Sequence, residues 1–272
     1  MKKNYYFKLG KNSFGEIYHV AMHGILIPKE ERDQFWVQLN DLQKDYISGF
    51  FDDLDIKYNV LSKQKFDFRS RTKTSDTISE KFDREIINKV NKRIYKIESV
   101  ENWKFPFADL ATPDPKILIW QRNVLYEPQR NSSVSLVRQL AEMAIKRGVL
   151  PVIIGPDQNI EGSYSLGDFH ENAFFKGDHS VCKQLWFQHM LFTHFGVKAS
   201  VGMMSGGMDG AAMFFGHKTI FFARKSDASP RMVKVANAVP GLHWFETEYD
   251  EYLAKLNERQ LNELEEKIWP RF

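Results

Sequence analysis

The stretch VGMMSGGMDGAAMFFGHKTIFF, residues 201–222, contains a strand, a glycine turn, a helix and a second strand in close succession. Gly206 and Gly207 let the backbone pass close to a ligand, and the helix that follows offers backbone N–H groups and the positive end of its dipole. A diphosphate group suits such a turn. The alternative interpretation is a tight turn whose small residues only pack the helix on the sheet. The stretch matches neither the dinucleotide motif G-x-G-x-x-G nor a P-loop.

Strands and helices alternate around this stretch. Residues 116–120 (KILIW) and 150–154 (LPVII) are short apolar runs typical of buried parallel strands. We predict helices over 132–147, 178–195 and 209–215, and strands over 197–203 and 218–223. This alternation predicts βαβ units, and hence an α/β fold with a doubly wound parallel sheet.

The first part of the chain is lysine-rich and less regular. Its pattern predicts a strand over 5–9, a helix over 28–54, a strand over 56–61 and a helix over 79–95 that is capped by Ser79. The prolines at 113 and 115 mark a linker, and 247–268 has the pattern of a charged amphipathic helix. We therefore predict domains over residues 1–112 and 113–246, followed by a helical segment over 247–272.

Composition restricts the class of protein. The 272 residues are 43% hydrophobic and 27% charged, which is ordinary for a folded protein. A net charge of +3 permits an anionic ligand but does not indicate a dedicated nucleic-acid binder. The single cysteine, Cys182, excludes an intramolecular disulfide and is expected to be a buried, inert thiol. The N-terminal residues lack the apolar run of a signal peptide and no membrane-length apolar run occurs, so we expect a cytoplasmic protein.

Polar residues follow other strands of the predicted sheet, where ligands of open α/β sheets bind. Arg122 and Arg130 could supply the guanidinium groups that suit phosphate oxygens. Residues 155–159 follow the next strand and could contact hydroxyls or a base, or form an ordinary polar loop. No metal-binding motif is present, and the adjacent pairs His170-Glu171 and Asp178-His179 are weak signals.

The second half resembles a known family. A strand followed by Arg-Asn at 122–123, a helix that ends in KRG at 146–148, LPVIIG at 150–155 and SGGMDGAAMFFG at 205–216 are similar to the C-terminal domain of GT-B glycosyltransferases, in particular heptosyltransferase-like and fucosyltransferase-like members. The resemblance implies two Rossmann-like domains that face a cleft, with a small N-terminal one. The heptosyltransferase-like pattern commonly has His where this chain has Asp209, which leaves the sugar and the nucleotide open.

The resemblance also implies where the donor and acceptor bind. The donor diphosphate would contact the turn and the basic residues from the first strand end: Ser205, Gly206, Gly207, Asp209, Arg122 and Arg130. The N-terminal domain would bind the acceptor, with the loop at 10–15 facing the cleft. An inverting transferase needs a base for the acceptor hydroxyl. Glu16 and His19 are our candidates, with Asp109 as an alternative.

The resulting hypothesis is a metal-independent glycosyltransferase. It would need no cofactor and would use a nucleotide-diphosphate sugar as donor and a glycan or lipid-linked acceptor. A modified DNA base is a second acceptor, because residues 63–73 mix basic and aromatic side chains. Another nucleotide-binding α/β enzyme, such as a sugar-nucleotide epimerase, and a non-catalytic nucleotide-binding protein remain as alternatives.

Overall fold

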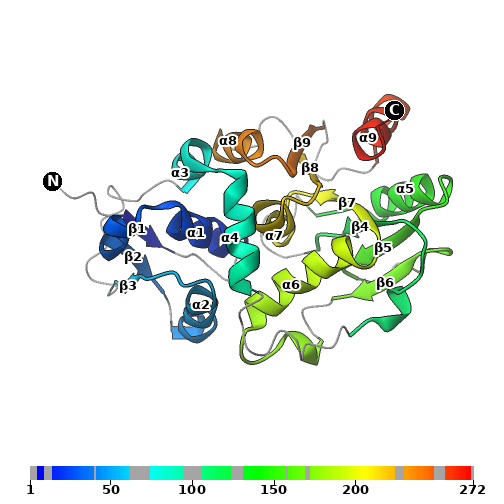
Figure 1. Cartoon of the computed structure of the whole chain (residues 1–272). Coiled ribbons are helices and arrows are strands. Elements are labelled where there is room, and N and C mark those ends of the chain that lie inside the picture. Colours follow the sequence, from blue (N-terminus) through cyan, green and yellow to red (C-terminus); the bar gives the residue numbers. More distant parts are fainter. Residues whose placement is uncertain are drawn as a thin grey trace.

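The computed structural model describes residues 5–8, 14–39, 41–61, 74–94, 106–123, 131–156, 159–168, 172–223, 230–247 and 255–270. Two parallel sheets form within these residues, one of three strands and one of six. Helices lie between the two sheets and on the outer face of the larger one (Figure 1). The predicted α/β class with parallel strands is therefore confirmed, whereas the domain boundaries at 112/113 and 246/247 stay predictions.

The smaller sheet has the order β1-β2-β3, and all its strands are parallel. Its elements are β1 (Tyr5–Lys8), α1 (Phe14–Leu26), the 3-10 helix η1 (Lys29–Gln34), β2 (Phe35–Gln38), α2 (Asp41–Asp53) and β3 (Asn59–Val60). The helix predicted over 28–54 is wrong in its first half. Phe35 and Val37 are fully buried, and this alternation places β2 between its two neighbours. The spacing of three and four that suggested one long helix holds only from Asp41 onward.

Two helices connect the sheets, α3 (Thr74–Lys81) and α4 (Arg84–Ile94). We predicted a single helix over 79–95 with Ser79 as its cap. The chain breaks instead at Asp83, whose side chain accepts a hydrogen bond from the backbone N–H of Glu85 at 3.1 Å. Asp83 is therefore the capping residue that starts the second helix, because a side-chain oxygen there satisfies a backbone donor of the first turn.

The larger sheet has the order β6-β5-β4-β7-β8-β9, and all five pairings are parallel. Its strands are β4 (Lys116–Trp120), β5 (Leu150–Ile154), β6 (Tyr164–Gly167), β7 (Val197–Met203), β8 (Thr219–Ala223) and β9 (Leu242–Glu246). Its connecting helices are α5 (Val134–Ile145), α6 (Ser180–Thr193), α7 (Gly206–Phe215) and α8 (Pro230–Ala238). The strand order reverses between β4 and β7, which is the topological switch point of a doubly wound sheet.

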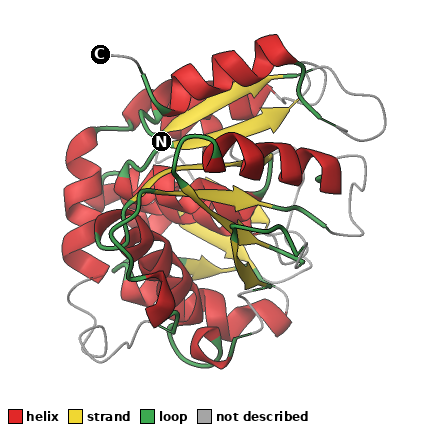
Figure 2. Cartoon of the chain, turned by 90° about the vertical axis from the view of Figure 1, so that its right-hand side faces the viewer, coloured by secondary structure: helices red, strands yellow, loops and turns green. Residues whose placement is uncertain are grey.

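Helices lie on both faces of this sheet (Figure 2), and its buried side chains alternate between the two clusters on these faces. Ile117 and Ile119 pack with α5 and with the C-terminal helix α9 (Glu258–Ile268) on one face, and Leu118 and Trp120 join the cluster on the other. The C-terminal helix is shorter than predicted. It begins with a capping box between Asn257 and Gln260, and β9 lies before it.

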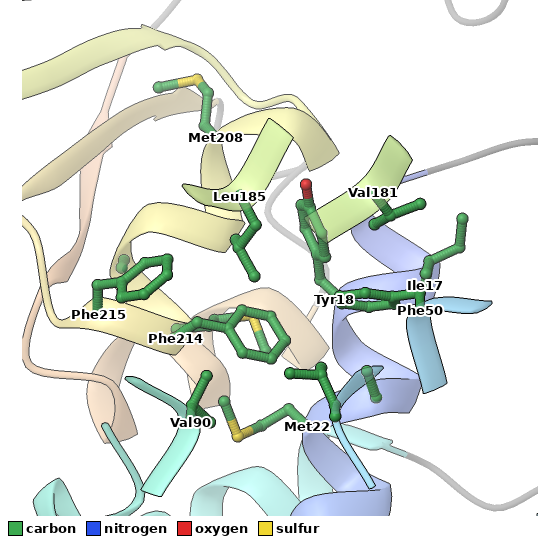
Figure 3. Packing of buried hydrophobic residues seen from close by; sticks show 14 of the residues in the cluster. Ile17, Tyr18, Met22, Phe50, Val90, Val181, Leu185, Met208, Phe214 and Phe215 are labelled. Carbon is green, nitrogen blue, oxygen red and sulfur yellow. The ribbon is translucent and has the colours of Figure 1, made fainter. Parts of the chain in front are cut away.

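Helix α7, in the second half of the chain, packs against helix α1 of the first half (Figure 3). The Tyr18 ring of α1 packs edge-on against Phe214 of α7, with ring centroids 5.6 Å apart. Gly210 allows this approach, since a Cβ at that position would lie 2.8 Å from Tyr18 Cε2 and 2.8 Å from Leu185 Cδ1. The first sheet and one face of the second therefore share a single hydrophobic core.

We predict that Gly210→Ala destabilises the protein by about 1–3 kcal/mol, because the added methyl group overpacks this contact. Gly49→Ala is the matched control, because Gly49 lies inside α2 with nothing within 4 Å of its Cβ position. The control is expected to stabilise by about 0.5–1 kcal/mol. Urea unfolding of both variants measures the difference, and equal effects would contradict the packing of α1 on α7.

Two histidines lie close together near the C-terminal ends of α6 and α7, one within α6 and the other just after α7. His189 Nδ1 lies 2.9 Å from His217 Nε2, and Phe192 and Phe215 stack on the two imidazoles. Burial lowers the pKa of His189 to about 4 and that of His217 to about 3, with smaller effects from neighbouring histidines. Both imidazoles are therefore held neutral in the folded protein.

Because the unfolded chain binds protons on these histidines at a higher pH than the folded chain does, stability must fall as the pH drops below about 6.5. We predict a loss of about 4 kcal/mol from the pair, about 2 kcal/mol for each histidine, between about pH 7 and about pH 5. Urea unfolding at the two pH values measures it. The double variant His189→Gln/His217→Gln should lose most of this pH dependence. Leu264→Ala, a buried change elsewhere, should lower stability equally at both pH values.

Candidate functional site

Helix α7 begins at the carboxyl end of β7, beside the switch point. Ser205 is its N-cap residue, and the Ser205 side chain makes no capping hydrogen bond. The first backbone N–H groups of a helix have no partner within it and lie at the positive end of the dipole. Ser205, Gly206 and Gly207 are partly exposed. We predicted a turn before a helix at 209, but the glycines themselves form the first turn of the helix.

The start of α7 is fixed over the end of β4. A Cβ on Gly207 would lie 3.1 Å from Cζ3 of the Trp120 ring. Trp120 is the last residue of β4 and pairs in register with Gly202 of β7. The absence of a side chain at Gly207 therefore lets the first turn of the helix rest on the indole ring at the sheet edge.

Arg122 lies at the same edge, two residues beyond β4. Its backbone N–H donates to Ser132 Oγ at 3.0 Å, and Ser132 N–H donates back to its carbonyl at 2.8 Å. The guanidinium Nη1 donates to Asn131 Oδ1 at 2.8 Å, and Arg122 as a whole residue is 8% exposed. These bonds close the base of the loop before α5. Trp120 and Gly202 are in register, and Arg122 and Ser205 each lie two residues beyond the end of their strand, so both lie just past the same edge of the sheet.

Some predicted residues lie outside the described part of the chain: Arg130, the loop at 10–13, residues 157–158, the His170-Glu171 pair and the basic segment at 63–73. Gly155, at the end of β5, has a φ of +127° and lies against the backbone of Gln121. The predicted polar strand end at 155–159 thus lies beside the strand that carries Arg122, although its two central residues are outside the described part.

The structure brings together two residues that were predicted for different roles. His19 Nε2 of α1 lies 3.4 Å from Oδ2 of Asp209 on α7, and the two side chains are 1% and 5% exposed. Within the described residues neither ring nitrogen of His19 has a hydrogen-bond partner. Asp209 therefore faces α1 rather than a diphosphate at the first turn of α7. A buried pair of this kind connects the two halves of the chain.

The remaining candidates for the base are placed apart from each other. Glu16 lies in the first turn of α1 and is partly exposed. Asp109 lies in the 3-10 helix η5 (Ala108–Leu110), is exposed, and contributes, after burial, to raising the pKa of Tyr164 on β6. Asp109 therefore lies near the edge strand and not at the switch point.

One arrangement was missed by the sequence analysis. His179 Nδ1 lies 2.7 Å from Oδ1 of Asp53, which is the last residue of α2. The only signal in the sequence was the Asp178-His179 pair, and the true partner is distant in the sequence. Cys182 is buried, as predicted; burial, with Asp53 next in effect, raises the pKa of its thiol.

The described residues contain neither a cluster of metal ligands nor a helix that could span a membrane. No group of three or more His, Cys, Asp or Glu side chains there could hold a metal ion. None of the described helices combines the length and apolar character that a bilayer crossing requires.

The fold is similar to that of a solved glycosyltransferase. No protein-family model matches the chain, and no curated protein matches its sequence. The structure of E. coli ADP-heptose lps heptosyltransferase II superposes with a TM-score of 0.50 and 12% sequence identity, over 97% of this chain and 98% of that chain. The likeness shows a heptosyltransferase-like GT-B fold, as the sequence predicted.

The buried pair of His19 and Asp209 can be tested by a double-mutant cycle. We predict that His19→Gln and Asp209→Asn each destabilise the protein, because each leaves a buried polar partner behind. Their coupling energy should be about 1–3 kcal/mol, as for residues in direct contact. Urea unfolding of the four proteins measures it. A coupling near zero would show that α1 and α7 are not joined by this pair.

Proposed function

We propose that this protein is a glycosyltransferase that transfers a sugar from a nucleotide-diphosphate donor to an acceptor hydroxyl without a metal ion. One observation carries the proposal: the uncapped first turn of α7 and the residue Arg122 lie at the same edge of the sheet, beside its switch point. This is where open α/β sheets bind nucleotides. The heptosyltransferase-like fold supports the same assignment, although fold alone does not fix function.

The chemistry requires stabilisation of a leaving group. As the bond between the anomeric carbon and the diphosphate breaks, the electron pair moves onto the diphosphate oxygen. The backbone N–H groups at Gly206 and Gly207 would donate to that oxygen, and the dipole of α7 would favour the negative charge. Arg122, held in place by Asn131, would supply a second positive charge. Donors fixed before the reaction need no reorganisation as charge develops.

The acceptor side is proposed to lie toward α1. Glu16 and His19 were both predicted as bases for the acceptor hydroxyl, and both roles remain proposals. Glu16 is partly exposed, whereas His19 is enclosed against Asp209. A glycan or lipid-linked sugar is the proposed acceptor and the cytoplasm the proposed location. No observation in the described part of the chain favours a DNA acceptor.

Substitutions at Ser205 test the donor site without removing a helix cap. Asp and Asn are N-cap residues as good as Ser, so Ser205→Asp and Ser205→Asn should both fold. We predict that Ser205→Asp weakens binding of a nucleoside diphosphate about tenfold or more, because its carboxylate repels the phosphates where they would meet the helix. Ser205→Asn should bind nearly as well as the wild type. Titration calorimetry with UDP, GDP, ADP and CMP, each with and without Mg²⁺, measures the affinities.

Arg122→Ala should weaken the same nucleotide about tenfold or more through the loss of charge-assisted hydrogen bonds. Arg138→Ala, an exposed arginine on α5, is the matched control and should change nothing. If none of the four nucleotides binds the wild type, or if Ser205→Asp and Arg122→Ala bind as well as it does, the proposed donor site is wrong. Binding that needs Mg²⁺ would overturn only the metal-independent part of the proposal.

A further inference from the structure

His179 and Asp53 form a histidine–carboxylate pair that the proposed function does not use. The Nδ1–Oδ1 distance is 2.7 Å. Asp53 is the last residue of α2, and His179 directly precedes α6. The His179 side chain is 34% exposed and that of Asp53 is 8% exposed. The imidazole is thus accessible from one side and held from the other by a nearly buried carboxylate.

The backbone holds this imidazole in a defined place. His179 has a φ of 60° and a ψ of 19°, the left-handed region that a non-glycine residue rarely adopts. It is the N-cap residue of α6, yet its side chain makes no capping bond and reaches Asp53 instead. Such backbone conformations persist where the surrounding structure fixes them, and they cluster at functional sites.

The pair lies level with the proposed donor site. Helices α6 and α7 lie side by side (Figure 1), and His189 contacts His217 at their C-terminal ends. His179 precedes His189 by ten residues, and Gly206 precedes His217 by eleven. His179 directly precedes α6 and Gly206 is the first residue of α7, and both helices run back from the carboxyl edge of a parallel sheet, so both helix starts lie at that edge.

The pair has the chemistry of a general base. When Nδ1 of His179 donates to Asp53, Nε2 carries the lone pair and can accept a proton. The carboxylate fixes that tautomer and stabilises the imidazolium ion that forms, as in other carboxylate-oriented histidines. His19 also lies beside a carboxylate, but its side chain is only 1% exposed. Glu16 is partly exposed but has no imidazole to accept a proton. His179 combines both properties.

We propose that His179, positioned by Asp53, is the base that activates the acceptor hydroxyl; this rests on the proposed transferase function. The acceptor oxygen forms a bond to the anomeric carbon as the bond from that carbon to the diphosphate oxygen breaks. The hydroxyl proton moves to Nε2 of His179, and the electron pair of the broken bond leaves on the diphosphate. A direct displacement of this kind inverts the anomeric centre.

Two measurements test the proposal on the full chain. The first is turnover of the nucleotide-diphosphate sugars that match the binding nucleotide, including slow donor hydrolysis with water as acceptor. His179→Ala should lower turnover about 10²-fold or more with unchanged nucleotide affinity, and added imidazole should restore part of it. Asp53→Asn should lower turnover without changing affinity. His194→Ala, an exposed histidine at the other end of α6, is the matched control and should be unaffected.

The second measurement is modification of histidines by diethyl pyrocarbonate, mapped by mass spectrometry. His179 should react and should be protected by the bound nucleoside diphosphate, whereas the buried His19 and His23 should be unreactive in both conditions. Nucleotide binding without protection of His179, or full turnover in His179→Ala, overturns the role of His179 but leaves the donor site standing. Failure of every nucleotide to bind overturns the proposed function, and this inference with it.

Discussion

Helix α7 packs both on the end of strand β4 and on helix α1, and the position of the candidate site depends on these two contacts. Gly207 rests on the Trp120 ring at the edge of the sheet, and Gly210 admits Tyr18 from the first half of the chain. The first contact sets where the helix begins, and the second sets how close α1 can come. The small residues between 206 and 212 therefore serve packing and leave backbone N–H groups exposed at the helix start.

The packing interpretation of the glycine stretch is confirmed, whereas the ligand-binding interpretation stays a prediction. The sequence allows either a ligand-binding turn or a turn whose small residues serve packing. In the structure the same residues pack the helix at one side and leave its uncapped first turn exposed at the other. Asp209 is the exception, since it points to His19 and is buried. Asp209 was predicted to contact the ligand because it follows the glycines in the sequence. It lies about one turn beyond the start of α7, and its side chain points toward α1.

The larger sheet could be predicted because its strands are short, apolar and separated by clear helices. The smaller sheet could not be predicted in full. Residues 35–38 satisfy both a helical and an alternating pattern, and only burial between β1 and β3 decides for a strand. The residues of the candidate site could likewise be predicted only in part. Arg122 and Ser205 follow strand ends, which a sequence reveals, whereas Asp53 and His179 are joined by a contact between residues 126 positions apart.

The two histidine–carboxylate pairs differ in exposure, and this difference separates their roles. The pair of His19 and Asp209 is enclosed between α1 and α7, so its two side chains face each other across the contact between the halves of the chain. The pair of His179 and Asp53 has a nearly buried carboxylate and an accessible ring, so a proton can be exchanged with a substrate from the open side. A base must meet the hydroxyl it deprotonates within hydrogen-bond reach. Accessibility, rather than residue type, therefore favours His179 over His19 as the group that reaches the acceptor.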